Sequence, residues 1–167
     1  MQHTTRYLAI LLWLLISFTV FANDNVLVGT FDIDATTPVG SPLAYDMAVG
    51  VQTPLSCRGV VIVPGNRAPI VLCALDWIGI SNGGQDVFRE QIAKAVGTQP
   101  NRVVVHTLHQ HDAPRCDFSA VAMLQQYGAP NEAFDIIHAR DVVKRAARAA
   151  KRAFNEAVVV THFGLGV

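Results

Sequence analysis

Charged residues are scarce in this sequence. Only 16% of its 167 residues are Asp, Glu, Lys or Arg, which is below the share of about a quarter that is usual in soluble domains. The 13 basic and 13 acidic residues balance, so the chain lacks the positive excess of a general nucleic-acid binder. It also lacks internal repeats and low-complexity segments. The hydrophobic share of 51% indicates extensive buried surface, or a face that meets more protein.

Cysteine is scarce as well. Cys57, Cys73 and Cys116 are too scattered for a zinc-finger pattern, and an odd number leaves at least one unpaired. Cys57 and Cys73 lie on consecutive predicted strands and could approach each other, although the inferred register does not place them directly opposite. Buried thiols that act as small hydrophobic side chains are the favoured interpretation, with a Cys57–Cys73 disulfide as the alternative.

The longest apolar run is N-terminal. Leu8–Phe21 is almost wholly apolar, follows a segment with one Arg and no acid, and is shorter than the roughly 20 residues of a membrane-spanning helix. These features predict a secretory signal peptide over Met1–Ala22, cleaved after Ala22, with an uncleaved anchor as the alternative. We therefore expect a secreted or periplasmic protein whose mature part, residues 23–167, has the length of about one domain.

The residue pattern in the first half of the mature chain indicates β-strands. Val26–Ile33 alternates enough to form a short strand. Leu55–Val63 and Ala68–Asp76 are rich in β-branched residues and flank Pro64–Arg67, which contains Pro, Gly and Asn and is a strong turn signal. These segments predict a β-hairpin.

A strand–helix–strand unit follows. After the turn Ser81–Gly84, apolar residues recur at helical spacing until Gly97 and Pro100, and Arg102–Leu108 is the next strand. The apolar stripe of this helix consists of Phe88, Ile92, Ala95 and Val96. A βαβ unit places its strands parallel, with the ligand crevice beyond their carboxyl ends.

The C-terminal third predicts a loop and a long helix. Ala113–Pro130 has few clear periods, and we expect a long loop with a short helical piece around Val121–Gln126. Asn131–Asn155 predicts a long helix whose small apolar residues pack on a sheet. One face of this helix is cationic and comprises Arg140, Lys144, Arg148 and Arg152. Such a face could be exposed to solvent, or it could attract anionic lipid or phosphate.

A further strand begins at Val158, and nothing in the sequence terminates it. We interpret the chain as the front of a longer protein, with a complete small domain as the alternative. The expected fold is therefore α/β, a mixed sheet with a β-hairpin and a βαβ unit, with helices packed on the sheet, in an incomplete domain.

The histidines concentrate at one strand end. The apolar run from Val103 leads directly into His109-Gln110-His111-Asp112. On an extended backbone, His109 and His111 would face the same way with Cα atoms roughly 7 Å apart, whereas His106 would face elsewhere. Two such imidazoles can share a metal ion, or one can bind it while the other acts as acid or base. The alternative is a hydrogen-bonded pair without a metal.

Two carboxylates accompany this histidine pair. Asp76 ends the neighbouring parallel strand at the same sheet edge, and Asp112 directly follows His111. Each could orient a metal-binding histidine through a hydrogen bond, or could simply cap a loop. His138 is expected to be structural or exposed, and Trp77 to belong to the core or to a pocket wall.

Three motifs, in order, resemble the N-terminal domain of neutral ceramidases. Asp34–Gly40 resembles that family's D-I-T-P-P-V-G segment, and Ile70–Gly79 resembles its strand ending in S-L-D-x-x-G. Leu108–Pro114 resembles the end of its V-x-x-x-x-T-H-T-H-S-G-P motif. The similarity runs from about Val28 to the last residue.

The resemblance implies an exported zinc amidohydrolase that splits the amide of ceramide into sphingosine and a fatty acid. It implies that His109 ligates zinc and that His111 lies in the site near the activated water. The family's Ser-Gly is replaced here by Asp112-Ala113, which changes the polarity beside the metal. The family's other zinc ligands are another His, a Glu and a Tyr, which lie well downstream in its sequence. The resemblance assigns no ligand role to His162.

The sequence therefore predicts a zinc-dependent hydrolase of an amide or related bond that holds one zinc ion with an incomplete ligand set. We expect His109 and His111 at the metal, with His111, Asp112 and Asp76 as catalytic candidates, and an isolated chain that is inactive. The expected partner is a small-molecule or lipid amide, with contact to a membrane surface as a further option. The alternative is a non-catalytic exported binding module, or an inactive fragment, with structural histidines.

Overall fold

The computed structural model describes residues 25–164 of the chain. The predicted signal peptide, residues 1–22, lies outside these residues. Among the helices of residues 25–164, none is long and apolar enough to cross a membrane.

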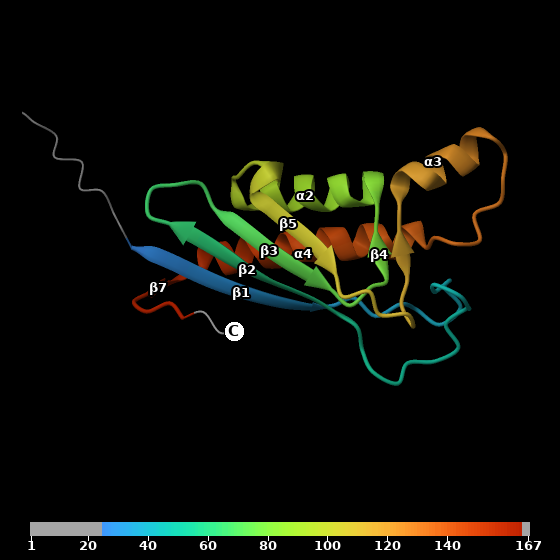
Figure 1. Cartoon of the computed structure of the whole chain (residues 1–167), viewed down its shortest axis with the longest axis horizontal. Coiled ribbons are helices and arrows are strands. Elements are labelled where there is room, and N and C mark those ends of the chain that lie inside the picture. The colour runs from blue at the N-terminus through green and yellow to red at the C-terminus, as the bar shows by residue number, and fades with distance from the viewer. Residues whose placement is uncertain (1–24, 165–167) are drawn as a thin grey trace, which may run out of the picture.

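A five-stranded mixed sheet is the centre of the fold, with strand order β5-β3-β2-β1-β7 (Figure 1). β1 pairs antiparallel with both β2 and β7, β2 pairs antiparallel with β3, and β3 runs parallel to β5. The α/β class, the β-hairpin and the parallel strand pair of the βαβ unit are thus confirmed. The strands are β1 (Val26–Asp34), β2 (Ser56–Pro64), β3 (Ile70–Leu75), β5 (Val103–Thr107) and β7 (Val158–Val160).

The hairpin between β2 and β3 forms at the predicted turn. Gly65 adopts a positive φ of 56°, which glycine tolerates without steric cost. The turn is closed by a hydrogen bond of 3.0 Å from the backbone N–H of Arg67 to the carbonyl of Pro64. Beyond the turn, alternate side chains of the two strands point to one face and are buried there, namely Cys57, Val61, Val71, Cys73 and Leu75.

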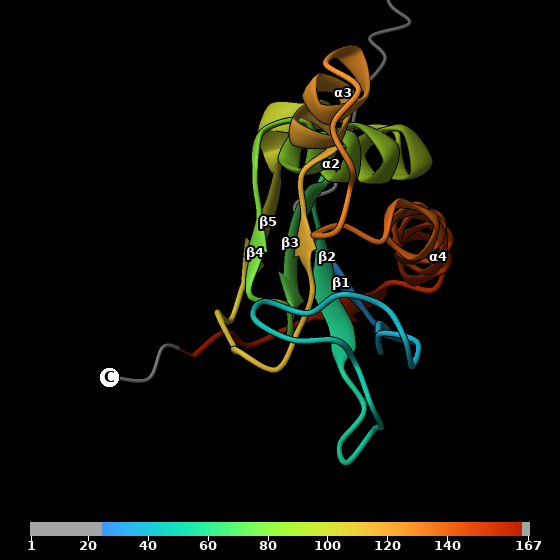
Figure 2. The same cartoon turned by 90° about the vertical axis from the view of Figure 1, so that its right-hand side faces the viewer.

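Two helices cover that face of the sheet. α2 (Asn82–Val96) connects the β3 side of the sheet to β5, and α4 (Ile136–Asn155) lies along β1 and β2. Figure 2 shows α4 end-on beside the sheet, with α2 packed next to it. Because α2 and α4 share this side, the core lies between them and the strands, and Trp77, Phe88 and Ile92 are fully buried there.

The opposite face of the sheet carries no helix of the described residues (Figure 2). Leu72 of β3 and Val104 of β5 are 45% and 51% exposed on this face. His106 also lies on it, because its strand neighbours Val105 and Thr107 point the other way. The expectation that His106 faces away from the histidine pair is consistent with this position.

The segment Ala113–Pro130 contains the helical piece that was predicted around Val121–Gln126, but it also contains a strand, so it is less of a loop than expected. β6 (Arg115–Cys116) pairs parallel with β4 (Gly79–Ile80) in a second, two-stranded sheet. α3 (Phe118–Gln126) then begins three residues before the helical piece that was predicted. The reason is that β6 is held by a distant partner strand, which local periodicity cannot indicate.

The starts of both late helices are determined by capping carboxylates. Asp117 accepts hydrogen bonds from the backbone N–H groups of Ser119 and Ala120 at 2.9 and 3.1 Å, and so begins α3. Asp135 accepts one from the N–H of His138 at 2.9 Å, so α4 begins at Ile136 rather than at Asn131 as predicted.

Candidate functional site

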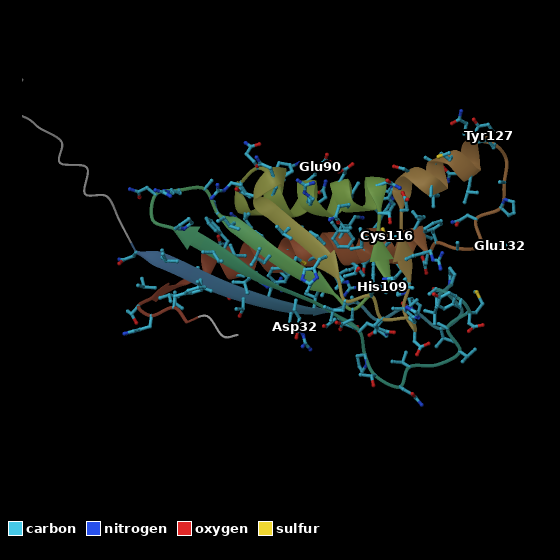
Figure 3. The ribbon with its side chains drawn as sticks, in the orientation of Figure 1. Asp32, Glu90, His109, Cys116, Tyr127 and Glu132 are labelled. Carbon is cyan, nitrogen blue, oxygen red and sulfur yellow. The ribbon has the colours of Figure 1, made fainter. Side chains whose placement is uncertain are left out.

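The histidine pair lies in the loop after β5, at the carboxyl end of the parallel strands (Figure 3). His109 has a positive φ of 60°, so its backbone is not extended and the premise of regular alternation was wrong. The cause is tertiary, because the N–H groups of Leu108 and His109 donate to the carbonyls of Leu75 and Trp77 at 2.9 and 3.2 Å and bend the chain there.

The two imidazoles nevertheless come together. The ring centroids of His109 and His111 are 5.2 Å apart, with an interplanar angle of 78°. Both residues are exposed. The bent loop therefore brings the two exposed rings into edge-to-face contact, as close together as was expected from an extended strand.

His109 is held in one tautomer by the main chain. Its Nδ1 lies 2.9 Å from the carbonyl oxygen of Ile78, in the segment between β3 and β4. Since a carbonyl oxygen only accepts, Nδ1 must carry the hydrogen, and in the neutral ring Nε2 then carries the free lone pair. In metal-binding histidines, one ring nitrogen commonly donates a hydrogen bond to a backbone carbonyl while the other ring nitrogen binds the metal.

His111 is supported from the other side by Tyr45. The two rings meet edge to face, with centroids 5.5 Å apart and an interplanar angle of 64°. Tyr45 lies in the long loop between β1 and β2, and sequence reasoning missed it. The Pro- and Gly-rich composition of residues 36–43 indicated a shaped loop, but nothing local indicated which side chain would reach the histidines.

The two predicted carboxylates lie near this edge in different roles. One carboxylate oxygen of Asp76 accepts hydrogen bonds from the N–H and the Oγ of Ser56, both at 2.7 Å, and so joins the end of β3 to the start of β2. These hydrogen bonds join Asp76 to the neighbouring strand β2 and not to the loop before Gly79 that it was expected to cap. Asp112 is exposed, and its backbone N–H donates to the side chain of Gln110 at 2.5 Å, which closes the turn around His111.

The described residues supply an incomplete set of metal ligands. Within residues 25–164, no group of three or more His, Cys, Asp or Glu side chains is positioned to hold a metal ion. His109, with its oriented Nε2, fits one zinc ligand, and the neighbouring His111 could supply a second. A catalytic zinc ion commonly has three protein ligands and one open position.

The other aromatic residues near the core have structural roles. Trp77 is fully buried, donates from Nε1 to the carbonyl of Ala35 at 3.0 Å, and meets Phe88 edge to face at 6.0 Å. His138 packs on Trp77 with a centroid distance of 5.9 Å, and burial lowers the pKa of its imidazole. Trp77 is therefore a core residue, which was one of its two expected roles; the other was a pocket wall.

Exposed apolar side chains gather on the loop that contributes Tyr45. Between Tyr45 and Val51 they occupy every second position. Tyr45, Met47, Val49 and Val51 are 71%, 51%, 93% and 51% exposed. Because Tyr45 contacts His111, this apolar loop segment borders the histidine pair directly.

No protein-family profile matches the sequence, and no curated protein matches it either. Solved structures do resemble it. The chain has a ceramidase-like fold. It superposes on the neutral ceramidase from Pseudomonas aeruginosa with a TM-score of 0.62 and 16% identity, over 80% of this chain and 22% of that one. A ceramidase complexed with C2 gives a TM-score of 0.55, again with 16% identity and the same shares.

The likeness at this identity concerns the fold alone. It confirms the ceramidase-like architecture that the sequence motifs predicted. The chain spans about a fifth of the length of these two solved ceramidases, at 22% of each.

Proposed function

We propose that this chain forms part of the active site of a zinc-dependent hydrolase that cleaves a lipid amide. The single observation that carries the proposal is the hydrogen bond from His109 Nδ1 to the Ile78 carbonyl, because it leaves Nε2 of this exposed histidine as the ring nitrogen that could bind a metal. In this proposal His109 binds zinc through Nε2. The ceramidase-like fold and the position beyond the carboxyl ends of parallel strands support this assignment.

His111 is proposed as the second imidazole of the site. It lies close enough to His109 to bind the same ion, or to exchange a proton with a group bound there. Its edge contact with Tyr45 restrains the ring and keeps it beside His109. Zinc, when bound, would polarise the amide carbonyl of the substrate as a Lewis acid. The remaining ligands would come from protein outside residues 25–164.

The surface beside the histidines supports the substrate class that we propose. Exposed apolar side chains at alternate positions from Tyr45 to Val51 cost free energy in water, and contact with an apolar chain removes that cost. A lipid amide combines an apolar tail, which this loop could contact, with a polar amide at the level of His111. The two solved structures described above are ceramidases, and a ceramide-like substrate is therefore the form we propose.

A titration with zinc tests the metal assignment. On the purified chain we expect zinc to shift the imidazole NMR signals of His109 and His111, and to move the signal of His109 Nε2 rather than Nδ1. His109→Ala should abolish the shift at His111 or weaken it at least tenfold in apparent affinity. His106→Ala is the matched control, because His106 is an exposed histidine on a different face, and it should change nothing.

Equal zinc shifts at all the histidines, or none at His109, would contradict the proposal. The alternative function, a non-catalytic module with structural histidines, is favoured by the incomplete ligand set among residues 25–164. It predicts that His109→Ala leaves zinc binding unchanged and alters only the packing of the loop on Ile78. The same titration therefore separates the two functions.

A further inference from the structure

The hydrogen-bonded register of the β2–β3 hairpin brings two cysteines together. Cys57 lies opposite Leu75, and Cys73 lies opposite Gly59, so the cysteines are diagonal neighbours on the same face of the sheet. Their Sγ atoms are 3.4 Å apart. The structure holds both as free thiols, yet the sulfur atoms are already in contact.

We propose that Cys57 and Cys73 form a disulfide as this hairpin folds under oxidising conditions. Diagonal neighbours have Cα atoms about 7–8 Å apart, slightly beyond the roughly 4.4–6.8 Å that is usual across a disulfide, so the two strands must shift slightly towards each other. Here the sulfur atoms must close from 3.4 Å to about 2.0 Å, which side-chain rotation together with a small backbone shift of the hairpin would achieve. Because Gly59 has no side chain, none projects from β2 directly opposite Cys73.

The bond must form before the core closes. Cys57 and Cys73 are 0% and 1% exposed, so an oxidant cannot reach them once α2 and α4 cover the sheet. The hydrogen bond with Cys57 and the burial both raise the pKa of the Cys73 thiol, so the attacking thiolate is scarce in the folded chain. The hairpin is local in sequence, with the two cysteines 16 residues apart, and can pair before the distant α4 packs on it.

The reaction is a thiol–disulfide exchange with balanced electrons. The two thiols lose two protons and two electrons, two S–H bonds break and one S–S bond forms. The electron acceptor is the disulfide of a thiol–disulfide oxidoreductase, or oxidised glutathione in vitro, which is reduced to two thiols. The export that the N-terminal sequence predicts would deliver the chain to a compartment with such an oxidant.

Cys116 provides an internal control. It lies on β6 in the other sheet, and burial, followed by the nearby Asp117 carboxylate, raises the pKa of its thiol to about 12. Because the chain has three cysteines, pairing of Cys57 with Cys73 leaves Cys116 without a partner, and it should remain a thiol. In this proposal the full chain holds one disulfide and one free cysteine.

The test is refolding from denaturant with reduced and oxidised glutathione, followed by alkylation of free thiols in denaturant and mass spectrometry. We expect one alkylated cysteine, a linked pair of peptides containing Cys57 and Cys73, and a melting temperature that falls when reductant is added. Cys116→Ser should keep the disulfide and leave no free thiol. Cys73→Ser should lose it and leave two free thiols.

Three free thiols after oxidative refolding, or a linkage that involves Cys116, would overturn the proposal. A second experiment tests whether the disulfide forms before the core closes. It uses wild-type protein alone, so its outcome does not depend on whether a variant folds. Wild-type protein folded in reductant and then exposed to oxidised glutathione should keep its thiols for hours, whereas refolding in the same buffer should yield the disulfide. Rapid oxidation of the prefolded protein would show that the bond does not require an open hairpin and would refute this order.

Discussion

Substitution of Gly29 tests the contact between α4 and the sheet. Gly29 lies in β1, and a Cβ atom at this position would lie 1.9 Å from the carbonyl oxygen of Ala153 and 2.6 Å from its carbonyl carbon. Both are backbone atoms of α4, so no side-chain rotation relieves the overlap. In Gly29→Ala the helix must withdraw by about 1.5 Å to reach ordinary contact at 3.4 Å.

The expected loss of stability follows from the packing of α4. Its buried face is built mostly of alanine, and small residues cannot rearrange to absorb a shift of the helix axis; they are Ala139, Ala146, Ala149, Ala150 and Ala153, with Val142 and Val143. Overpacking in a well-packed core costs about 1–3 kcal/mol, and the backbone clash places Gly29→Ala near the upper end. A loss of about 3 kcal/mol would lower Tm by roughly 6–12 °C for a domain of this size.

Chemical denaturation followed by circular dichroism, together with a thermal melt, measures this loss. Gly50→Ala is the matched control, because a Cβ at Gly50 would meet no atom within 4 Å. We expect the control to remain within about 0.5 kcal/mol of the parent, as surface substitutions usually do. If Gly29→Ala were as stable as Gly50→Ala, the close packing of α4 on β1 would be refuted.

Two further predictions concern carboxylates. Asp117→Ala removes the acceptor for the N–H groups of Ser119 and Ala120 and should cost about 1 kcal/mol in a denaturation experiment, with fraying of the first turn of α3 in hydrogen exchange; unchanged exchange there would contradict the cap. Hydrogen bonds from Thr36 lower the pKa of the Asp34 carboxyl below its ordinary value of 3.8. Because this folded-state pKa is depressed, its stabilising contribution is complete well above pH 3.8 and is lost as the pH falls through the folded pKa. Asp34→Asn should therefore flatten the acid limb of a stability–pH curve, and an unaltered limb would argue against the hydrogen bond.

Local patterns were sufficient for most of the regular structure. The β-branched runs on either side of Pro64–Arg67 and the helical spacing after Ser81–Gly84 depend on the chain's own neighbours, and the hairpin and α2 formed where expected. The predicted stripe of α2 was correct for Phe88, Ile92 and Val96, but Ala93 is buried in place of Ala95. That difference depends on where α4 lies, which the sequence of α2 cannot indicate.

The candidate site was predictable in part. The spacing of His109 and His111 after an apolar strand correctly indicated that their rings would lie close together at one sheet edge. The backbone conformation that brings the rings together differs from the expected one. Hydrogen bonds to the carbonyls of Leu75 and Trp77 bend the backbone, which was expected to be extended. Tyr45 reaches His111 from a loop more than sixty positions earlier, and no local signal connects the two.

The sequence by itself determined the strand and helix segments, the class of fold and the pair of imidazoles, because these depend on side-chain periodicity and on residue types close together in the chain. Only the tertiary structure decided the tautomer of His109, the contact of Tyr45 with His111 and the meeting of Cys57 with Cys73. Each of these depends on strand register or on a loop packed against a distant segment. Such contacts are chosen by the free energy of the whole fold, and the residues involved carry no local trace of them.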